Sequence, residues 1–212
     1  AGGEIEYTCL GGNQYEVTLV SYWDCGGAPP PSDIDLSFNS NCSSFTESNI
    51  GLTSSREVSQ ICPSFLANSE CNAGSLPGLE ERIYTTVVTL PTCPNDFYTV
   101  SFDFARRNVS GNLQEFFGGT QGPVFEVETT INQNGSFCNN SPEFDGQPIP
   151  FVCVGQNVQY NFQATDPDGD SLVYSIIQPK PNPSANYVAP TYSPASPFGI
   201  PTVLNSTTGQ LS

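Results

Sequence analysis

Residues 98–104 decide the fold class, and they read Tyr98-Thr99-Val100-Ser101-Phe102-Asp103-Phe104. Apolar and polar side chains alternate, which is the pattern of a β-strand with one face in a protein core. Similar strand signals, separated by turn residues, recur along the chain at residues 4–9, 15–19, 82–90, 125–131, 158–163 and 172–177. Short strands at this spacing predict antiparallel β-sandwiches.

The composition agrees with a β-rich chain. Glycine and proline number 19 each among the 212 residues and leave no uninterrupted amphipathic stretch that predicts a helix. Aromatic residues make up 11% and supply core volume, so the chain is not predicted to be disordered. We therefore predict an all-β fold of tandem antiparallel β-sandwich domains, Ig-like or cadherin-like, with disulfides.

The charge balance excludes several classes of function. Acidic residues outnumber basic residues 21 to 5, giving a formal net charge of −16, whereas nucleic acids and anionic membranes attract clustered Lys and Arg. The sequence contains no run of 18 apolar residues, so no membrane-spanning helix is predicted. Histidine is absent, which removes the usual general base and every nucleophile–His pair. We predict no nucleic-acid partner, no membrane insertion and no enzymatic activity; a hydrolase with paired carboxylates is the remaining catalytic alternative.

Eight cysteines, with no CxxC pair among them, predict a disulfide framework formed in an oxidising compartment. A reduced cytosolic protein with scattered thiols is the alternative. Cys62–Cys71 and Cys138–Cys153 are expected as local bridges, because each pair encloses a short loop that contains Pro or Gly. All eight cysteines are expected to form disulfides: Cys9, Cys25, Cys42, Cys62, Cys71, Cys93, Cys138 and Cys153.

A change in composition near residues 132–142, rich in Asn, Ser and Gly, predicts a linker. The predicted domains are a disulfide-rich sandwich at 1–132, a linker at 133–143 and a second β-domain at 144–212. Because the second stretch is short for a complete sandwich, it is expected to be truncated at its C-terminal end.

Three aspartates at a spacing of two form the strongest local motif: Asp166, Asp168 and Asp170, with Gly169 in the turn. Calcium prefers six to eight oxygen ligands, and closely spaced carboxylates supply several of them. The three aspartates are therefore the predicted metal ligands, with Ca²⁺ as the cofactor. The alternative is an acidic turn with solvated side chains.

The same motif carries a resemblance. Asp166-Pro-Asp168-Gly-Asp170 followed by Leu-Val-Tyr-Ser-Ile resembles the core of cadherin-like repeats. Upstream, Asn140-Ser-Pro142-Glu-Phe144 resembles the boundary that opens such repeats, and Thr208-Gly209-Gln210-Leu211-Ser212 resembles a later strand of them. An acidic pair expected before the boundary is here Asn139-Asn140, which leaves fewer charges for calcium shared between domains.

The first half resembles another group of proteins. Residues 2–15, Ser21-Tyr22-Trp23-Asp24-Cys25, residues 71–80 and Thr89-Leu90-Pro91-Thr92-Cys93 are similar to the N-terminal region of large Bacteroidetes cell-surface adhesins of the SprB-like, gliding-motility type. The resemblance implies a cell-surface adhesin exported across the outer membrane by the type IX secretion system. It also implies outer-membrane secretion or anchoring partners and an external surface or polysaccharide as ligand. A self-assembling extracellular fibre subunit completed by strand donation is the alternative.

Two local features admit two interpretations each. Trp23 beside Cys25 is predicted to be a core residue, and a sugar-stacking platform with Tyr22 is the alternative. The run Pro29-Pro30-Pro31 is predicted to be a rigid surface loop, and a polyproline ligand is the alternative.

Overall fold

A computed structural model of the chain describes residues 2–94, 96–104, 124–133, 138–146, 159–178, 180, 193–197 and 202–212. The chain divides into two compact units, each formed from two separate stretches of sequence. The first comprises Ala1–Asp103 and Val127–Ser141, and the second comprises Phe104–Glu126 and Pro142–Ser212. The described residues are mostly β-structure, with antiparallel strand pairing and three disulfides.

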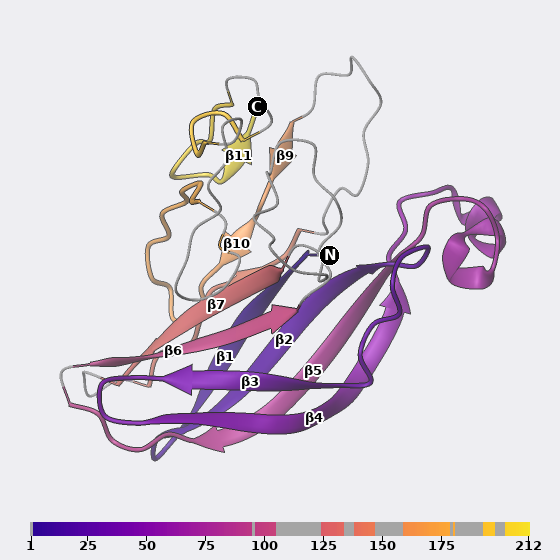
Figure 1. The fold of residues 1–212 in the computed structure, drawn as a ribbon. Coiled ribbons are helices and arrows are strands. Elements are labelled where there is room, and N and C mark those ends of the chain that lie inside the picture. The colour runs from indigo at the N-terminus through magenta and orange to yellow at the C-terminus, as the bar shows by residue number, and fades with distance from the viewer. Residues whose placement is uncertain are drawn as a thin grey trace. The chain divides into compact units, whose positions relative to one another are not determined.

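One sheet organises the first unit, with strand order β1-β2-β5-β4-β3-β6-β7. Figure 1 shows these strands as the long arrows. Two short 3₁₀ helices, η1 and η2, interrupt the chain between β4 and β5. The bounds are β1 Gly2–Gly11, β2 Gln14–Asp24, β3 Asp33–Asn39, β4 Ser44–Glu57, η1 Pro63–Asn68, η2 Glu70–Asn72, β5 Leu79–Thr89, β6 Phe97–Phe104 and β7 Phe125–Asn132.

The long strand β4 belongs to both halves of this sheet. Its first half pairs with β3, where Ser37 lies opposite Thr46 and Phe38 stacks on Phe45 with ring centroids 4.8 Å apart. Its second half pairs with β5, where Arg56 lies opposite Glu81. Irregular registers near the middle of β4 accompany this change of partner, as at the bulges by which strands bend.

The buried residues follow the period of two predicted from the sequence. In β2 the side chains of Tyr15, Val17, Leu19, Ser21 and Trp23 are buried, while the intervening residues are exposed or half-buried. Because Trp23 is only 5% exposed, its interpretation as a core residue is confirmed. Similar alternation supplies further buried residues from β3 and β6: Ile34, Leu36, Phe38, Tyr98, Val100 and Phe102.

The disulfides connect distant parts of the first unit. Cys9 bonds Cys138, Cys25 bonds Cys71, and Cys42 bonds Cys93. Both predicted local bridges, Cys62–Cys71 and Cys138–Cys153, are therefore wrong. The two 3₁₀ helices fill the interval after Cys62 and bring Cys71 to the end of β2, where the backbone N–H of Cys25 donates to the carbonyl of Gly78 at 3.0 Å.

Cys62 is exposed and carries no disulfide in the structure, so the expectation that every cysteine is bridged fails at this position. Cys153 lies outside the described residues. Six of the eight predicted disulfide cysteines are thus paired. Three disulfides are typical of proteins that fold in an oxidising, extracellular environment.

Part of the predicted linker is bonded to the edge of the first unit. The backbone N–H of Tyr7 in β1 donates to Oγ of Ser141 at 2.8 Å, and the N–H of Ser141 donates to the carbonyl of Tyr7 at 2.9 Å. The N–H of Cys9 donates to Oδ1 of Asn140 at 2.8 Å. Strand β1 lies at the edge of the sheet. Together with the Cys9–Cys138 disulfide, these bonds cover part of its outer edge, whose backbone groups would otherwise be exposed.

The second unit has only short strand pairs among its described residues. Strand β8 (Glu143–Phe144) pairs with β10 (Ala164–Thr165), and β9 (Tyr160–Asn161) pairs with β11 (Gln210–Leu211). The predicted strand at 172–177 is not formed; among the hydrogen bonds of the described residues, the backbone N–H of Tyr174 donates to the carbonyl of Ser206 at 2.8 Å. No helix in the described ranges is long and apolar enough to cross a membrane.

Candidate functional site

The aspartate motif forms a tight turn after β10. Oδ1 of Asp166 accepts the backbone N–H groups of Asp168 at 2.9 Å and Asp170 at 3.1 Å. The N–H of Gly169 donates to the carbonyl of Asp166 at 3.1 Å, and Gly169 has a φ of +81°, a conformation that favours glycine. The motif is therefore an aspartate-capped turn, in which one carboxylate oxygen of Asp166 binds backbone.

The turn does not gather its three carboxylates around one point. Within the described ranges, no group of three or more Asp, Glu, Cys or His side chains is arranged to hold a metal ion. Asp168 and Asp170 are exposed, so a calcium ion would have to draw their carboxylates together. The residue types suit calcium, whereas the described arrangement is that of an acidic turn.

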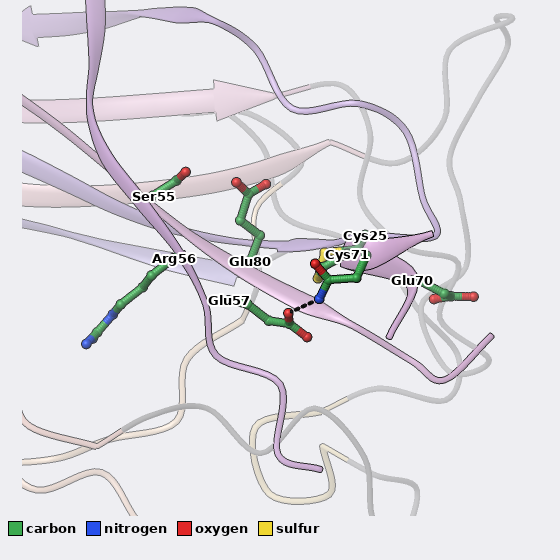
Figure 2. Close-up of a pocket in the computed structure, with 8 residues that line it drawn as sticks. Cys25, Ser55, Arg56, Glu57, Glu70, Cys71 and Glu80 are labelled. Atoms are coloured by element: carbon green, nitrogen blue, oxygen red, sulfur yellow. Dashed lines mark hydrogen bonds between the residues drawn. A yellow bond between two sulfur atoms is a disulfide. The ribbon is translucent and has the colours of Figure 1, made fainter. Parts of the chain in front are cut away.

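A polar pocket of about 380 Å³ lies where β2, β4, β5 and η2 meet in the first unit. Figure 2 shows the Cys25–Cys71 disulfide at its wall. Three carboxylates line it: Glu57 at the end of β4, Glu70 in η2 and Glu80 in β5. Arg56 is its one basic residue. The lining therefore offers mainly hydrogen-bond acceptors, which suits hydroxyl groups and cations better than anions.

Two of these carboxylates are held by neighbouring side chains. Glu57 accepts Oγ–H of Ser59 at 2.7 Å and Nδ2–H of Asn72 at 2.8 Å. Desolvation alone would raise the pKa of Glu57, but hydrogen bonds from Ser69, Ser59 and Asn72 lower it below its ordinary value. Glu80 pairs with Arg82 at 3.1 Å. Glu57 and Glu80 thus present oriented carboxylate oxygen atoms to the pocket.

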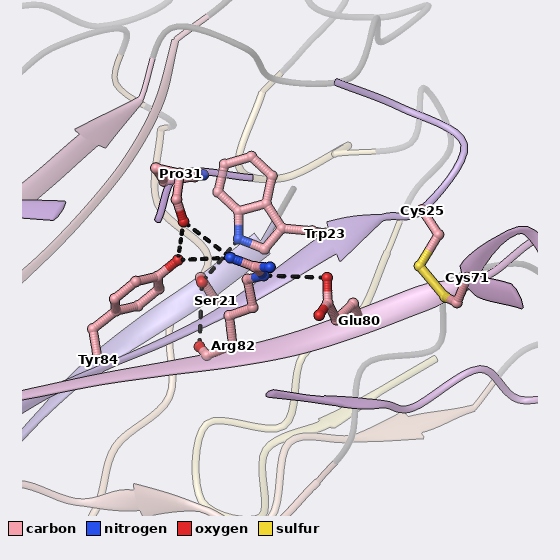
Figure 3. A network of polar contacts seen from close by, with 8 residues as sticks. All are labelled: Ser21, Trp23, Cys25, Pro31, Cys71, Glu80, Arg82 and Tyr84. Carbon is pink, nitrogen blue, oxygen red and sulfur yellow. Dashed lines mark hydrogen bonds and ion pairs between the residues drawn. A yellow bond between two sulfur atoms is a disulfide. The ribbon is translucent and has the colours of Figure 1, made fainter. Parts of the chain in front are cut away.

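A polar network that shares Glu80 with the pocket fixes the proline run to β5. Nη1 of Arg82 donates to the carbonyl of Pro31 at 3.0 Å, and Oη of Tyr84 donates to the same carbonyl at 2.7 Å (Figure 3). Nε1 of Trp23 donates to Oγ of Ser21 at 2.9 Å. These bonds favour the interpretation of the proline run as an anchored loop.

A second group of carboxylates lies on the other face of β1, β2 and β5. Glu4 is half-buried there, with Glu6 two residues along β1 and Glu81 on β5. Glu81 is buried and bound by the guanidinium of Arg56, with Nη2 and Oε1 3.0 Å apart. Desolvation, followed by repulsion from Glu6 and Glu81, raises the pKa of Glu4 to about 7, although a hydrogen bond from Tyr22 opposes this.

The raised pKa of Glu4 predicts a pH-dependent stability. Unfolded Glu4 ionises near its ordinary pKa, whereas folded Glu4 keeps its proton until about 7, so its contribution to stability is lost as pH rises through this range. We expect Glu4→Gln to raise the free energy of unfolding at about pH 8 and to change it little at about pH 4. Urea unfolding at both pH values measures this. Glu16→Gln, at an exposed position of β2, is the control; an equal effect of Glu4→Gln at both pH values would contradict the assignment.

Sequence reasoning did not find the pocket. Its residues come from four elements, and no local motif links Glu57, Glu70 and Glu80. Only the cysteines at positions 25 and 71 were a signal, and their pairing was not derivable from spacing. Comparison of the chain with protein family models, with characterised proteins and with solved structures finds no match.

Proposed function

We propose that the protein is a non-catalytic, extracellular adhesin of a gliding-type bacterium, the N-terminal part of a longer secreted protein. In this proposal the first unit is a β-sandwich of the Ig-like or cadherin-like kind. It is displayed at the cell surface after export across the outer membrane by a type IX system. Outer-membrane secretion or anchoring proteins are its partners, and an external surface or polysaccharide is its ligand.

The observation that carries the proposal is the pattern of long-range disulfides in a β-rich, acidic chain. The Cys9–Cys138 bond spans 129 residues and ties both ends of the first unit together. Such crosslinks suit a protein that must stay folded outside the cell. The acidic pocket beside Cys25–Cys71 adds oriented carboxylates, which can accept hydrogen bonds from sugar hydroxyls.

Adhesion is tested by coating beads with the purified chain and measuring their retention on polysaccharide-coated and bare surfaces. We expect retention on at least one polysaccharide, and we expect Glu70→Gln in the pocket to reduce it. Glu16→Gln, which removes the same charge from an exposed strand position, should leave retention unchanged. No retention above beads coated with reduced, alkylated chain would argue against an adhesin, and equal effects of both variants would argue against the pocket.

Calcium binding at Asp166, Asp168 and Asp170 is part of the proposal. An ion that binds only the folded state stabilises it by about 2.7 kcal/mol at a hundredfold excess over Kd. Extracellular modules commonly bind with Kd of about 10⁻⁴–10⁻³ M, so roughly 10 mM calcium should raise Tm, and EDTA should reverse the gain. Asp168→Asn should remove most of it. Identical melts in calcium and EDTA would leave the motif as an acidic turn.

A self-assembling fibre subunit is the second candidate, and one observation favours it. Each described strand of the second unit, from β8 to β11, is only two residues long. Ladders this short bury little surface, and strands supplied by another chain would extend them.

A further inference from the structure

The second half of strand β4 has an open edge. Its first half pairs with β3 as far as Gly51, and the backbone N–H of Leu52 still donates to the carbonyl of Ser32 at 3.3 Å. Beyond this point β4 pairs on one side only, with β5. Residues 51–56 are exposed on both faces of the strand. This stretch is therefore a bare edge of the kind to which a further strand can add.

The backbone of Ser55 and Glu57 points to the open side of this edge. The N–H of Val58 donates to the carbonyl of Leu79 at 2.8 Å and continues the β4–β5 register. Because backbone groups of successive residues point to opposite sides, Arg56 also faces β5, whereas Ser55 and Glu57 face away from it. In the part of the chain that the structure describes, the outward N–H and C=O groups of these two residues make no hydrogen bond.

The acidic pocket lies directly beside this edge. Ser55 and Glu57 line it, and they share one face of β4 because side chains alternate along a strand. The guanidinium of Arg56 is engaged by Glu81, which lies on the other face of the sheet. Figure 2 shows Arg56 pointing away from the carboxylates of Glu57 and Glu80. Arg56 therefore leaves the negative charge of these carboxylates largely unbalanced.

Glu70 is the carboxylate of the pocket that has no partner of its own. Glu57 and Glu80 are held by neighbouring side chains. The side chain of Glu70 makes no hydrogen bond or ion pair with any residue that the structure describes, although it is half-buried and lies close against Gly26. An ammonium or guanidinium group that entered the pocket would supply the missing partner through a charge-assisted hydrogen bond.

We propose that the open edge of β4 binds an extended, basic segment of a partner protein by antiparallel strand addition. Backbone groups of the segment pair with the outward N–H and C=O groups of Ser55 and Glu57. A residue opposite Ser55 has its Cβ about 4.5–5.5 Å away and projects on the same face, so a lysine or arginine there reaches into the pocket toward Glu70. The next residue of the segment projects beside Arg56, where a neutral or acidic side chain fits.

Charge favours a basic partner over a second copy of this chain. With a net charge of −16, the chain attracts basic segments and repels its own copies at low ionic strength. The inference goes beyond the proposed adhesion, because it concerns a protein contact and depends on the first unit alone. Its test uses no polysaccharide, so either proposal can fail without the other.

Fluorescence anisotropy of labelled, blocked peptides titrated with the full chain tests strand addition. A short peptide that alternates threonine and lysine should bind, and more weakly as salt is raised. A peptide that alternates threonine and glutamate should not bind. The threonine–lysine peptide with methylated lysine backbone nitrogens keeps its charge but loses the donors that face β4, so it should not bind either. Equal binding of the methylated and unmethylated peptides would overturn strand addition, and so would no binding of the unmethylated one.

Variants of the chain locate the contact. Ser55→Pro removes an N–H on the open side, which an edge strand tolerates, and should weaken binding of the threonine–lysine peptide about tenfold or more. Ser55→Lys keeps the backbone intact and should also weaken binding, because it places a positive charge on the pocket face. Glu70→Gln should weaken binding about two- to fivefold. Glu16→Gln removes the same charge from an exposed position of β2 and should leave binding nearly unchanged.

Two outcomes would overturn the assignment of the site or of its occupant. Full binding by Ser55→Lys and Glu70→Gln would place the peptide elsewhere on the chain. Sedimentation velocity of the chain alone tests a second copy as the occupant, and we expect Ser55→Lys to leave the oligomeric state unchanged. A dimer that is present in the wild type and lost in Ser55→Lys would mean that the edge of β4 pairs with itself.

Discussion

Replacing Cys9 and Cys138 together by serine is expected to give the largest loss of stability in this protein. The Cys9–Cys138 disulfide closes a loop of 129 residues, longer than those closed by Cys25–Cys71 and Cys42–Cys93. In the chain-entropy model, opening a loop of this length costs about 5 kcal/mol, an upper estimate. That is a large fraction of the stability of a typical domain, which is about 5–15 kcal/mol. The double variant should unfold at a much lower urea concentration than the wild type.

Cys62→Ser is the matched control for this prediction. It makes the same chemical change at an exposed cysteine that carries no disulfide, so it should change the free energy of unfolding by less than about 0.5 kcal/mol. If the double variant and Cys62→Ser have the same unfolding midpoint, the disulfide does not constrain the unfolded chain, and the support that it gives to an extracellular function is lost.

Periodicity predicted the strands that alternate strongly. The hairpin of β1 and β2, and strands β5, β6 and β7, lie at the predicted positions, because one face of each must be apolar. Strand β3 was missed, although Ile34, Leu36 and Phe38 alternate in it. Strand β4 gives almost no signal, since Ile50 is its only buried residue. The backbone hydrogen bonds of β4 are made with β3 along one part and with β5 along the other, and they do not require an apolar stripe of side chains.

The sequence alone was less informative about tertiary contacts. Disulfide pairing depends on which chain segments meet. Cys25, directly after β2, bonds to Cys71 in η2 and donates its backbone N–H to Gly78, directly before β5. Spacing along the chain does not encode such a meeting, so the local bridges were mispredicted. The prediction of a strand at 172–177 was wrong for a related reason. An alternating sequence pattern favours an extended chain, but it does not by itself specify a partner strand. Of the candidate sites, only the aspartate turn was visible in sequence, and its calcium binding remains a prediction.

Strand β3, which the sequence pattern missed, should share one core with the predicted strand β2. Substitution of two leucines tests this. Leu36 in β3 has no exposed surface, whereas Leu10 in β1 is 51% exposed. We expect Leu36→Ala to lower the free energy of unfolding by about 2–5 kcal/mol, because it removes buried methyl groups and leaves a cavity. Leu10→Ala deletes the same atoms from a surface position and should cost well under about 1 kcal/mol. Urea unfolding of both variants, monitored by tryptophan fluorescence, makes the comparison.

Trp23 lies in β2, so a single transition that shifts with Leu36→Ala would show that β3 and β2 unfold together. A Trp23 transition unmoved by Leu36→Ala would mean that the β3 half of the sheet is a separate folding unit.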